Sequence, residues 1–320
     1  MKLHLDKENF AGLLSNIRET SNIDADILEK DYFVCVVLEQ LSQRQDELKA
    51  YFKGGTAIYK KLADMRRFSE DIDLTVRDDE TLSNKKNKHK LEESAEGYST
   101  EGLQLACDMT DKRKGSVTAF YKYESAVSYD VNPLRRAGEI QVEATSFTES
   151  EPIEDCEIQP LIYKLATADQ RAILESRYDV APFNVATITL ERAFIDKLFA
   201  AQKYLGDLNT PALSRPVELA KHLYDIAVLF KEARIHNFLT DKSELARMEI
   251  IRRREEQVRV GGVSPDVQIA DFDIFKLPLP KEAYSAFDSM QAKYVLQDKY
   301  EISVKVLNET LASIHEALKN

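Results

Sequence analysis

The sequence predicts an α+β fold, with a mixed β-sheet in the N-terminal part and a bundle of helices in the C-terminal part. β-Branched and alternating segments gather before about residue 160, whereas later segments carry apolar residues at helical spacing. The chain has 320 residues, 43% of them hydrophobic, which is enough for two cores. We therefore expect one domain over residues 1–160 and a second, helical domain over residues 161–320.

The N-terminal elements follow from local patterns. An apolar stripe at helical spacing predicts helices over residues 7–20 and 24–44, the second with Asp24 as its N-cap. Short strands are expected in "AYFKGG" and "IDLTV", and "TAIYKKLA" between them reads as the first turns of a helix. The polar region 78–114 fits a helix flanked by loops. Alternation predicts antiparallel strands over 116–131 and 138–148.

Helical patterns dominate the rest of the chain. Helices are expected in "LIYKLATADQRAIL", "TLERAFIDKLFAAQKYL", "RPVELAKHLYDIAVLF", "DKSELARMEIIRRREEQVR" and, as two or three helices, over residues 281–320. Residues 260–280 read as a long loop. The sequence shows no internal repeat.

Composition limits the classes of function. The net charge of −11 disfavours general nucleic-acid binding, although a local basic patch could still contact phosphates. No apolar run is long enough to span a bilayer and the N-terminus lacks a signal-peptide core, so we expect a cytoplasmic protein without a membrane partner. Cys35, Cys107 and Cys156 lack zinc-type spacing and read as free thiols.

Two features of "FKGGTAIYKKLADMRRFSEDIDLTV" indicate chemistry. Gly54 and Gly55 stand between a strand and a helix start, where backbone N–H groups can face an anion, and Thr56 adds a hydroxyl. Asp71 and Asp73 share one face of the next strand, and their carboxylates repel unless a cation or water lies between them. Glycine turn and carboxylates together predict a site for a nucleoside triphosphate bridged by Mg²⁺, with Mn²⁺ as an alternative. Taken alone, Gly-Gly-Thr is also common in plain turns, and Asp-x-Asp is also common on exposed strands and helix caps.

A third acid would complete a two-metal site. Glu143 in "EIQVEATSF" is the candidate metal ligand and also a candidate base for the attacking hydroxyl, with Glu139 as its competitor.

Other charged residues have structural as well as functional interpretations. Lys197 borders an apolar helical stripe, so its ammonium reaches either a cleft or solvent. Asp225 lies among apolar neighbours and needs a partner, either Lys197 or an arginine for structure, or a group in the site. Asp31 poses the same problem, and there we favour a structural role. The arginine-rich run 246–259 could touch RNA, but its glutamates are spaced to pair with its arginines on one helix.

The basic segment "NKKNKHK" at residues 84–90 is a further candidate for phosphate contacts, with a plain surface loop as the alternative.

At this point the sequence resembles a known family. The segment "KGGTAIYKKLADMRRFSEDIDL" is similar to the signature of the AbiEii/AbiGii nucleotidyltransferases, toxins of bacterial type IV toxin–antitoxin and abortive-infection systems that are related to the mycobacterial MenT toxins. Their catalytic core is similar to that of DNA polymerase β. The segments "LEKDYFVCVVLEQL", "ERAFIDKLFA" and "AKHLYDIAVLF" resemble further family helices, so the likeness runs from about residue 24 to 230.

The resemblance implies roles for individual residues. Gly55 and Thr56 would hold the triphosphate, and Asp71 and Asp73 would bind Mg²⁺. Arg67 and Ser69 would lie beside the nucleotide, Lys197 would meet the triphosphate, and Asp225 would complete the site. The sequence departs from the family pattern in the long spacing between Thr56 and Asp71 and in His222, which stands where an arginine is frequent.

The predicted function is therefore Mg²⁺-dependent transfer of a nucleoside monophosphate from an NTP to an RNA acceptor, with the tRNA 3′ end as the best candidate. The resemblance also implies a separately encoded antitoxin, often a winged-helix repressor. One alternative keeps the site and makes a protein the acceptor of the nucleotide or of a terminal phosphate. Another is a non-catalytic module in which Asp71 and Asp73 bind metal for structure alone.

Overall fold

A computed structural model describes residues 2–127, 138–259 and 261–319, and confirms the predicted α+β fold. The chain divides into two compact units, Met1–Ile188 and Thr189–Asn320. This division falls after residue 188, later than the expected boundary at residue 160, because the sheet of the first unit takes its last strand from residues 183–188.

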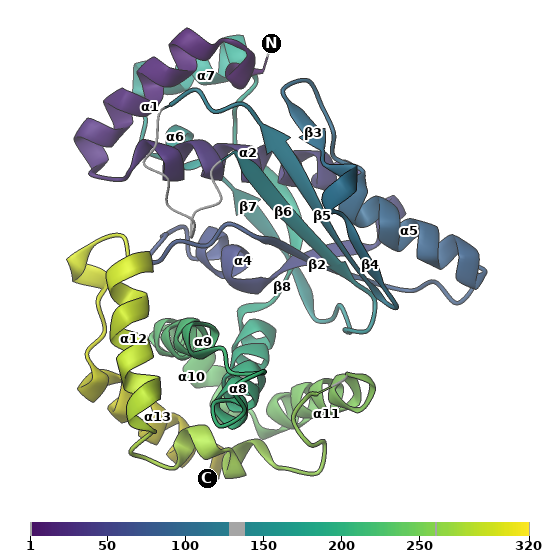
Figure 1. Ribbon diagram of the computed structural model, residues 1–320, viewed down its shortest axis with the longest axis vertical. Helices are drawn as coiled ribbons and strands as arrows, with labels where there is room; N and C mark the ends of the chain where they lie inside the picture. Colours follow the sequence, from purple (N-terminus) through teal and green to yellow (C-terminus); the bar gives the residue numbers. More distant parts are fainter. Residues whose placement is uncertain (1, 128–137, 260, 320) are drawn as a thin grey trace. The chain divides into compact units, whose positions relative to one another are not determined.

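The first unit is built on one mixed sheet (Figure 1). The strand order is β3-β5-β6-β2-β1-β8-β7, and β4 pairs with β5. The strands are β1 Ala50–Lys53, β2 Ile72–Val76, β3 Leu103–Leu105, β4 Asp111–Arg113, β5 Ser116–Tyr123, β6 Glu139–Thr145, β7 Ile153–Ile158 and β8 Phe183–Ile188. The helices are η1 Leu3–Leu5, α1 Lys7–Ser21, α2 Ala25–Ser42, α3 Gln45–Leu48, α4 Gly54–Lys61, α5 Asn84–Glu96, η2 Cys107–Met109, α6 Leu161–Lys164 and α7 Ala168–Tyr178.

The two faces of the sheet differ in polarity. On one face, alternate residues of β2, β5 and β6 are fully buried and pack against helices α2 and α5. Tyr123 stacks on Phe33 of α2, and the Tyr121 hydroxyl donates to the Ala95 carbonyl of α5. Most of the residues between them are polar, and Asp73, Gln141 and Glu143 are only partly buried, whereas Thr75 and Thr145 are buried. The central strands therefore present a polar face opposite the packed one.

Pairing places specific side chains side by side on this polar face. Lys53 of β1 is opposite Asp73 of β2 in an antiparallel pair, and Asp73 is beside Glu143 of β6 in a parallel pair. Glu143 is in turn opposite Thr118 of β5. Because register partners point to the same side of a sheet, Lys53, Asp73, Glu143 and Thr118 form one row across four strands.

The predicted helices and strands of this unit are largely confirmed. The antiparallel pairing of 116–131 with 138–148 is observed as β5 with β6, although β5 ends at Tyr123 and residues 128–131 lie outside the described part of the chain. Strands β7 and β8 were not predicted, nor were the short strands β3 and β4. Asp24 does occupy the N-cap position of α2.

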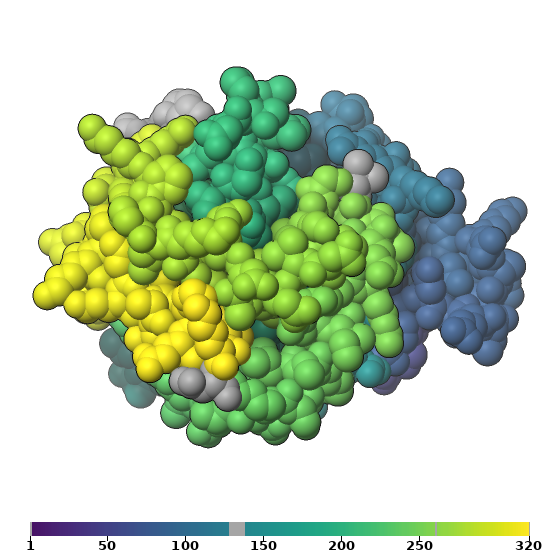
Figure 2. All heavy atoms as spheres, turned by 90° about the horizontal axis from the view of Figure 1, so that it is seen from below, coloured from purple at the N-terminus to yellow at the C-terminus, as the bar shows by residue number. Residues whose placement is uncertain are grey.

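The second unit contains helices throughout its described residues. They are α8 Leu190–Asp207, α9 Pro216–Leu229, α10 Ala233–Thr240, α11 Lys242–Val258, η3 Ile269–Asp271, η4 Asp273–Phe275, α12 Lys281–Tyr294, η5 Asp298–Tyr300 and α13 Val304–Lys319. Figure 2 shows α13 in yellow beside the lighter green segment of the two short helices η3 and η4, which it contacts. Across the described ranges, each helix is too short or too polar to cross a membrane.

Candidate active site

The glycine turn between β1 and α4 holds a carboxylate against its backbone. Gly54 has a φ of +83°, a backbone conformation that residues with a side chain rarely adopt. A β-carbon added to it would lie 2.0 Å from Oδ2 of Asp73. The absence of a side chain at Gly54 therefore lets the Asp73 carboxylate approach the first turn of α4.

The next glycine packs against the segment that precedes β2. A β-carbon on Gly55 would lie 2.8 Å from Nη2 of Arg67 and 2.8 Å from Oγ of Ser69. The hydroxyls of Thr56 and Ser69 share a hydrogen bond of 3.0 Å. Arg67 is buried, stacks over the Tyr59 ring and donates from Nη1 to the Phe68 carbonyl. The structure thus brings the glycine turn together with Arg67 and Ser69.

The acidic residues lie on the polar face of the sheet. Asp71 and Asp73 are half-buried on either side of the fully buried Ile72, as expected for residues that share one face of an extended segment. Glu143 is the parallel register partner of Asp73, so their backbones are about 4.8 Å apart. Glu139, the competing acid, lies at the start of β6 on the same face, four residues earlier.

These residues fit a magnesium ion held by few protein ligands. Among the described residues, no three His, Cys, Asp or Glu side chains are close enough together to form a metal site on their own. The three-carboxylate set of Asp71, Asp73 and Glu143 therefore stays a prediction. Mg²⁺ in phosphoryl-transfer sites commonly takes one or two carboxylates and completes its shell with phosphate and water oxygens. Asp73, which lies against the glycine turn, and Asp71 on the same side of the segment suit such a shell.

Three consecutive charges of helix α2 hold this region in place. Glu29, Lys30 and Asp31 are all buried. Lys30 forms an ion pair with Glu70, the residue before Asp71. The anchoring of Glu70 on α2 therefore restrains the start of the acidic strand.

Asp31 joins helix α4 to helix α6. One carboxylate oxygen accepts from Lys60 Nζ at 2.5 Å, and the other accepts from the Leu161 N–H at 2.6 Å. Burial alone would lower the pKa of Lys60, but its interactions with Asp31 and Cys35 together outweigh burial and raise this pKa above its usual value. The structural role that we favoured for Asp31 agrees with these contacts.

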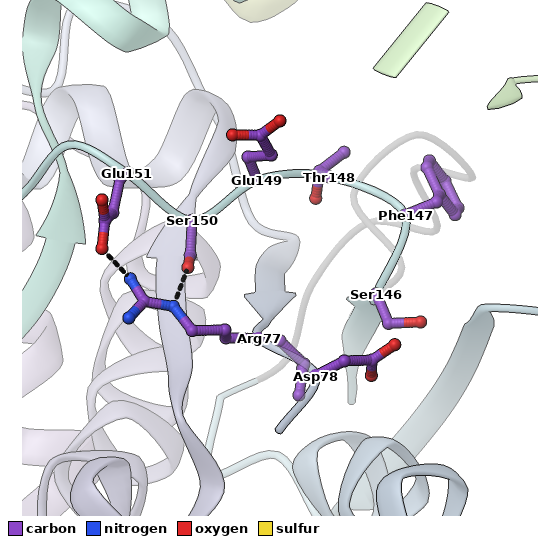
Figure 3. Close-up of a pocket in the computed structure, with 9 residues that line it drawn as sticks. Arg77, Asp78, Ser146, Phe147, Thr148, Glu149, Ser150 and Glu151 are labelled. Carbon is purple, nitrogen blue, oxygen red and sulfur yellow. Dashed lines mark hydrogen bonds and ion pairs between the residues drawn. The ribbon is translucent and has the colours of Figure 1, made fainter. Parts of the chain in front are cut away.

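A cavity lies where the parallel strands β2 and β6 end. It has a volume of about 350 Å³ and is lined by the segments 76–78 and 146–151 (Figure 3). Arg77 donates from Nε to Ser150 Oγ at 3.1 Å and pairs with Glu151. Sequence analysis did not single out these residues, because the cavity depends on the parallel pairing of two strands far apart in the chain.

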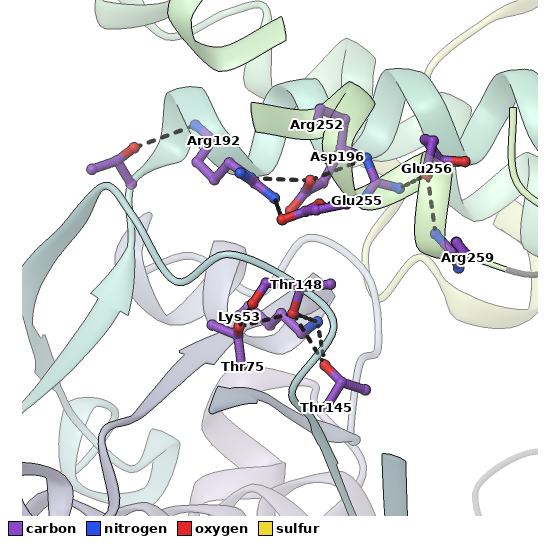
Figure 4. A network of polar contacts seen from close by, with 11 residues as sticks. Lys53, Thr75, Thr145, Thr148, Arg192, Asp196, Arg252, Glu255, Glu256 and Arg259 are labelled. Carbon is purple, nitrogen blue, oxygen red and sulfur yellow. Dashed lines mark hydrogen bonds and ion pairs between the residues drawn. The ribbon is translucent and has the colours of Figure 1, made fainter. Parts of the chain in front are cut away.

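A lysine that sequence analysis missed lies next to the glycine turn. Nζ of Lys53 donates to the hydroxyls of Thr145 at 3.0 Å and Thr148 at 3.3 Å (Figure 4). The Thr148 hydroxyl donates to Thr75 Oγ1, and the Thr75 hydroxyl donates to the Thr148 carbonyl, both at 2.8 Å. One signal was available in the sequence, because Lys53 alternates with the apolar Phe52 in a strand and so faces the side opposite the core.

In the second unit, the two remaining candidate residues form a buried ion pair. Lys197 of α8 lies 2.7 Å from Oδ2 of Asp225 of α9, and their side chains are 9% and 0% exposed. This is the structural pairing that we had considered for Asp225. Contact with a triphosphate remains a prediction for Lys197.

The arginine-rich helix α11 is paired, and it has one buried and one exposed side. Arg252 binds Glu255 and Glu256 within the helix, and Arg192 of α8 binds Glu255, each at 2.5 Å (Figure 4). All four side chains are at most 4% exposed. Pairing within the helix was predicted correctly, whereas its burial against α8 was not. The basic segment 84–90 forms the exposed start of helix α5, apart from the half-buried Asn87 and the buried Lys90.

Together, the fold and the site define a protein with a strand–glycine turn–helix–strand unit that carries a carboxylate against the glycine turn. Residues 36–306 match the profile of the family described as the nucleotidyl transferase AbiEii toxin, type IV TA system. The chain therefore belongs to the AbiEii family of nucleotidyltransferase toxins of type IV toxin–antitoxin systems. The match extends through most of the second unit, beyond the motifs recognised in the sequence.

Among solved structures, the chain is similar to MenT4, a nucleotidyltransferase toxin from Mycobacterium tuberculosis H37Rv. The sequence identity is 14% and the TM-score 0.41, over 95% of this chain and 98% of that one. A comparison with curated protein sequences finds no significant match.

Proposed function

We propose that this enzyme transfers a nucleoside monophosphate from an NTP to a hydroxyl at the 3′ end of an RNA, with tRNA as the acceptor. One observation supports the proposal most directly. The Asp73 carboxylate lies against Gly54, at the N-terminus of α4, so an acidic ligand for a metal and the N–H groups of an anion-binding turn are adjacent. A magnesium-bound triphosphate is held by groups of these two kinds, a carboxylate for the metal and N–H donors for the phosphates.

The chain's own groups then have distinct tasks. The backbone N–H groups of Gly55 and Thr56 bind phosphate oxygens, and Arg67 and Ser69 stabilise the turn from the side. Asp71 and Asp73 would hold Mg²⁺ or Mn²⁺, which, when bound, offsets the charge that develops on the phosphates. Lys197 and Asp225 belong to the second unit, and their part in the reaction stays a prediction.

The transfer step is a substitution at the α-phosphorus. The acceptor oxygen forms a bond to this phosphorus while the bond to the β-phosphate oxygen breaks, and pyrophosphate leaves with the electron pair. The proton of the acceptor hydroxyl must pass to a base. Glu143, the strand neighbour of Asp73, is the residue we propose for that role.

Growth arrest would follow because a tRNA with an extended 3′ end cannot be charged. We place this reaction in the cytoplasm, and we propose that a separately encoded antitoxin of the winged-helix repressor type controls it.

The experiment is to incubate the purified protein and Mg²⁺ with tRNA and with total cell protein, using each of the four NTPs labelled at the α-phosphate. We expect label on RNA. Label on protein alone would replace the RNA acceptor with a protein. In a parallel incubation with NTPs labelled at the γ-phosphate, transfer of γ-label without transfer of α-label would indicate a kinase reaction. The absence of transfer to either, together with growth arrest that survives Asp71→Ala, would support a non-catalytic module.

A further inference from the structure

We propose that Lys53 limits the acidic residues of the polar face to one divalent metal ion, because its ammonium is fixed on the side of Asp73 where a second ion would bind. This inference rests on the metal site of the proposed function. Lys53 directly precedes the glycine turn, and neither the sequence motifs nor the family likeness assign it a role.

The path of the Lys53 side chain follows from the order of the strands. Strand β2 lies between β1 and β6. Lys53 of β1 is the register partner of Asp73, whereas Thr145 of β6, to which Lys53 donates, is the register partner of Thr75. Asp73 and Thr75 are successive residues on the polar face of β2. The lysine therefore crosses this face between Asp73 and Thr75.

Threonine hydroxyls hold the ammonium at the end of this path. Thr145 Oγ1 accepts from Lys53 Nζ at 3.0 Å and Thr148 Oγ1 accepts at 3.3 Å (Figure 4). The Thr148 hydroxyl donates to Thr75 Oγ1 at 2.8 Å, and the Thr145 hydroxyl donates to the Leu74 carbonyl at 3.2 Å. Because each hydroxyl has one proton and uses it in these bonds, both oxygens present lone pairs to the lysine. Threonine is neutral, so these bonds fix the positive charge without cancelling it.

The Asp73 carboxylate is directed to the other side. Its Oδ2 lies against Gly54, where an added β-carbon would be only 2.0 Å away. Gly54 follows Lys53 in a strand antiparallel to β2, so it lies toward Asp71 and away from Thr75. A metal ion bound by Asp71 and Asp73 would therefore lie on the glycine-turn side, with the lysine on the opposite side.

The fixed ammonium opposes a second ion between Asp73 and Glu143. Glu143 and Thr145 are successive residues on the polar face of β6, about 7 Å apart. An ion shared by Asp73 and Glu143 would lie within roughly this distance of the ammonium, and like charges so close repel each other. Among the described residues, no three potential metal ligands lie together, which agrees with a single ion. Lys53 then supplies the positive charge that a second ion would bring to Glu143, the proposed base.

The first test counts metal ions without NTP or RNA. The full-length protein is titrated with Mn²⁺, and the EPR signal of free Mn²⁺ gives the number of ions bound. The difference between wild-type protein and Asp73→Asn counts only the ions that depend on this carboxylate. We expect a difference of one ion. A difference of two ions, or of none, would overturn the inference without recourse to any change at Lys53.

Substitutions of Lys53 test the role of its charge. Lys53→Met removes the charge and should bind a second Mn²⁺ at least about tenfold more tightly than wild-type protein does, because a neighbouring charge alters ionic equilibria on this scale. Lys53→Arg should still bind one ion. Lys85→Met, at the exposed start of α5, controls for the lost net charge and should also bind one. Unchanged or weaker Mn²⁺ binding by folded Lys53→Met would overturn the inference, since a lysine that only supports the fold would give that result.

Transfer assays on the same proteins separate this inference from the proposed function. If wild-type protein binds two Mn²⁺ ions at this site and transfers α-label to RNA, the role of Lys53 is refuted and the enzymatic function stands. If wild-type protein binds one ion, Lys53→Met binds two, and neither RNA nor protein is labelled, the role of Lys53 stands and the proposed function is refuted.

Discussion

The substitution Gly54→Ala tests how closely Asp73 approaches the glycine turn. The new β-carbon would lie 2.0 Å from Asp73 Oδ2 and 2.9 Å from Cγ, far inside van der Waals contact. The backbone at φ +83° adds about 1–2 kcal/mol of strain for a residue with a side chain. The carboxylate must therefore move by about 1 Å or more, and misplacement of a catalytic group by that distance can reduce the rate about 10²-fold.

The control for backbone strain is Gly261→Ala. Gly261 has a similar φ of +71°, but an added β-carbon meets no atom within 4 Å. Both variants should lower the free energy of unfolding in urea by about 1–2 kcal/mol or more, because they share the strain. Transfer of labelled NMP should fall about 10²-fold in Gly54→Ala alone.

The reasoning about the turn would be refuted by a Gly54→Ala protein that transfers NMP at the wild-type rate. Equal activity losses in Gly54→Ala and Gly261→Ala would also contradict it, since the loss would then follow from backbone strain and not from displacement of Asp73.

Further predictions concern buried charges and thiols. Lys197→Met should lower the free energy of unfolding in urea by about 3 kcal/mol, because it leaves the Asp225 carboxylate buried without the lysine, and the double variant with Asp225→Leu should lose less. Burial raises the pKa of Cys35 to about 12, so iodoacetamide at pH 8 should label the exposed Cys107 first, and equal labelling rates would disprove this. Burial raises the pKa of Glu29 above 4.5, so its contribution to stability is present below that pH and is lost as the pH rises through the raised value. As the pH rises through this pKa, the free energy of unfolding should therefore fall less in Glu29→Gln than in the wild-type protein. Identical pH profiles of the two proteins would contradict this role of Glu29.

The local part of the site could be predicted from sequence because it depends on short-range geometry. Strand, glycine turn, helix and acidic strand follow each other between Ala50 and Val76, so a glycine turn near acidic residues was expected. The direct packing of Asp73 against Gly54 was not predicted and comes from the structure. Glu143 is different, because its place beside Asp73 depends on parallel pairing of β6 with β2. Sequence alternation predicted that β6 is a strand but contains no information about its partner.

Strands β7 and β8 were missed for related reasons. In β7, "IEDCEI", the first, third and fifth residues are exposed. Three of the six residues are acidic, which weakens the apolar pattern that would indicate a strand. Strand β8 is followed after one residue by helix α8, and its parallel neighbour β1 lies more than 120 residues earlier. Pairing over such a distance leaves no local pattern.

The buried charges of α2 were the hardest feature to predict. Successive helical residues point in directions about 100° apart. Burial of Glu29, Lys30 and Asp31 therefore requires that different segments cover the helix on several sides. Their partners are in the loop at residues 125–126, at Glu70 and at Lys60. A single sequence shows charged residues at these positions but cannot identify the distant groups that neutralise them.

The measurement that tests the central claim most directly is the rate of NMP transfer to RNA by Asp73→Asn. This substitution keeps the size of the side chain and removes its charge, so the fold should survive while metal binding is lost. Asp155→Asn, an exposed aspartate of β7, is the control. We predict a loss of at least about 10³-fold in Asp73→Asn at unchanged stability, with a wild-type rate for Asp155→Asn. Wild-type transfer by a folded Asp73→Asn protein would contradict the account.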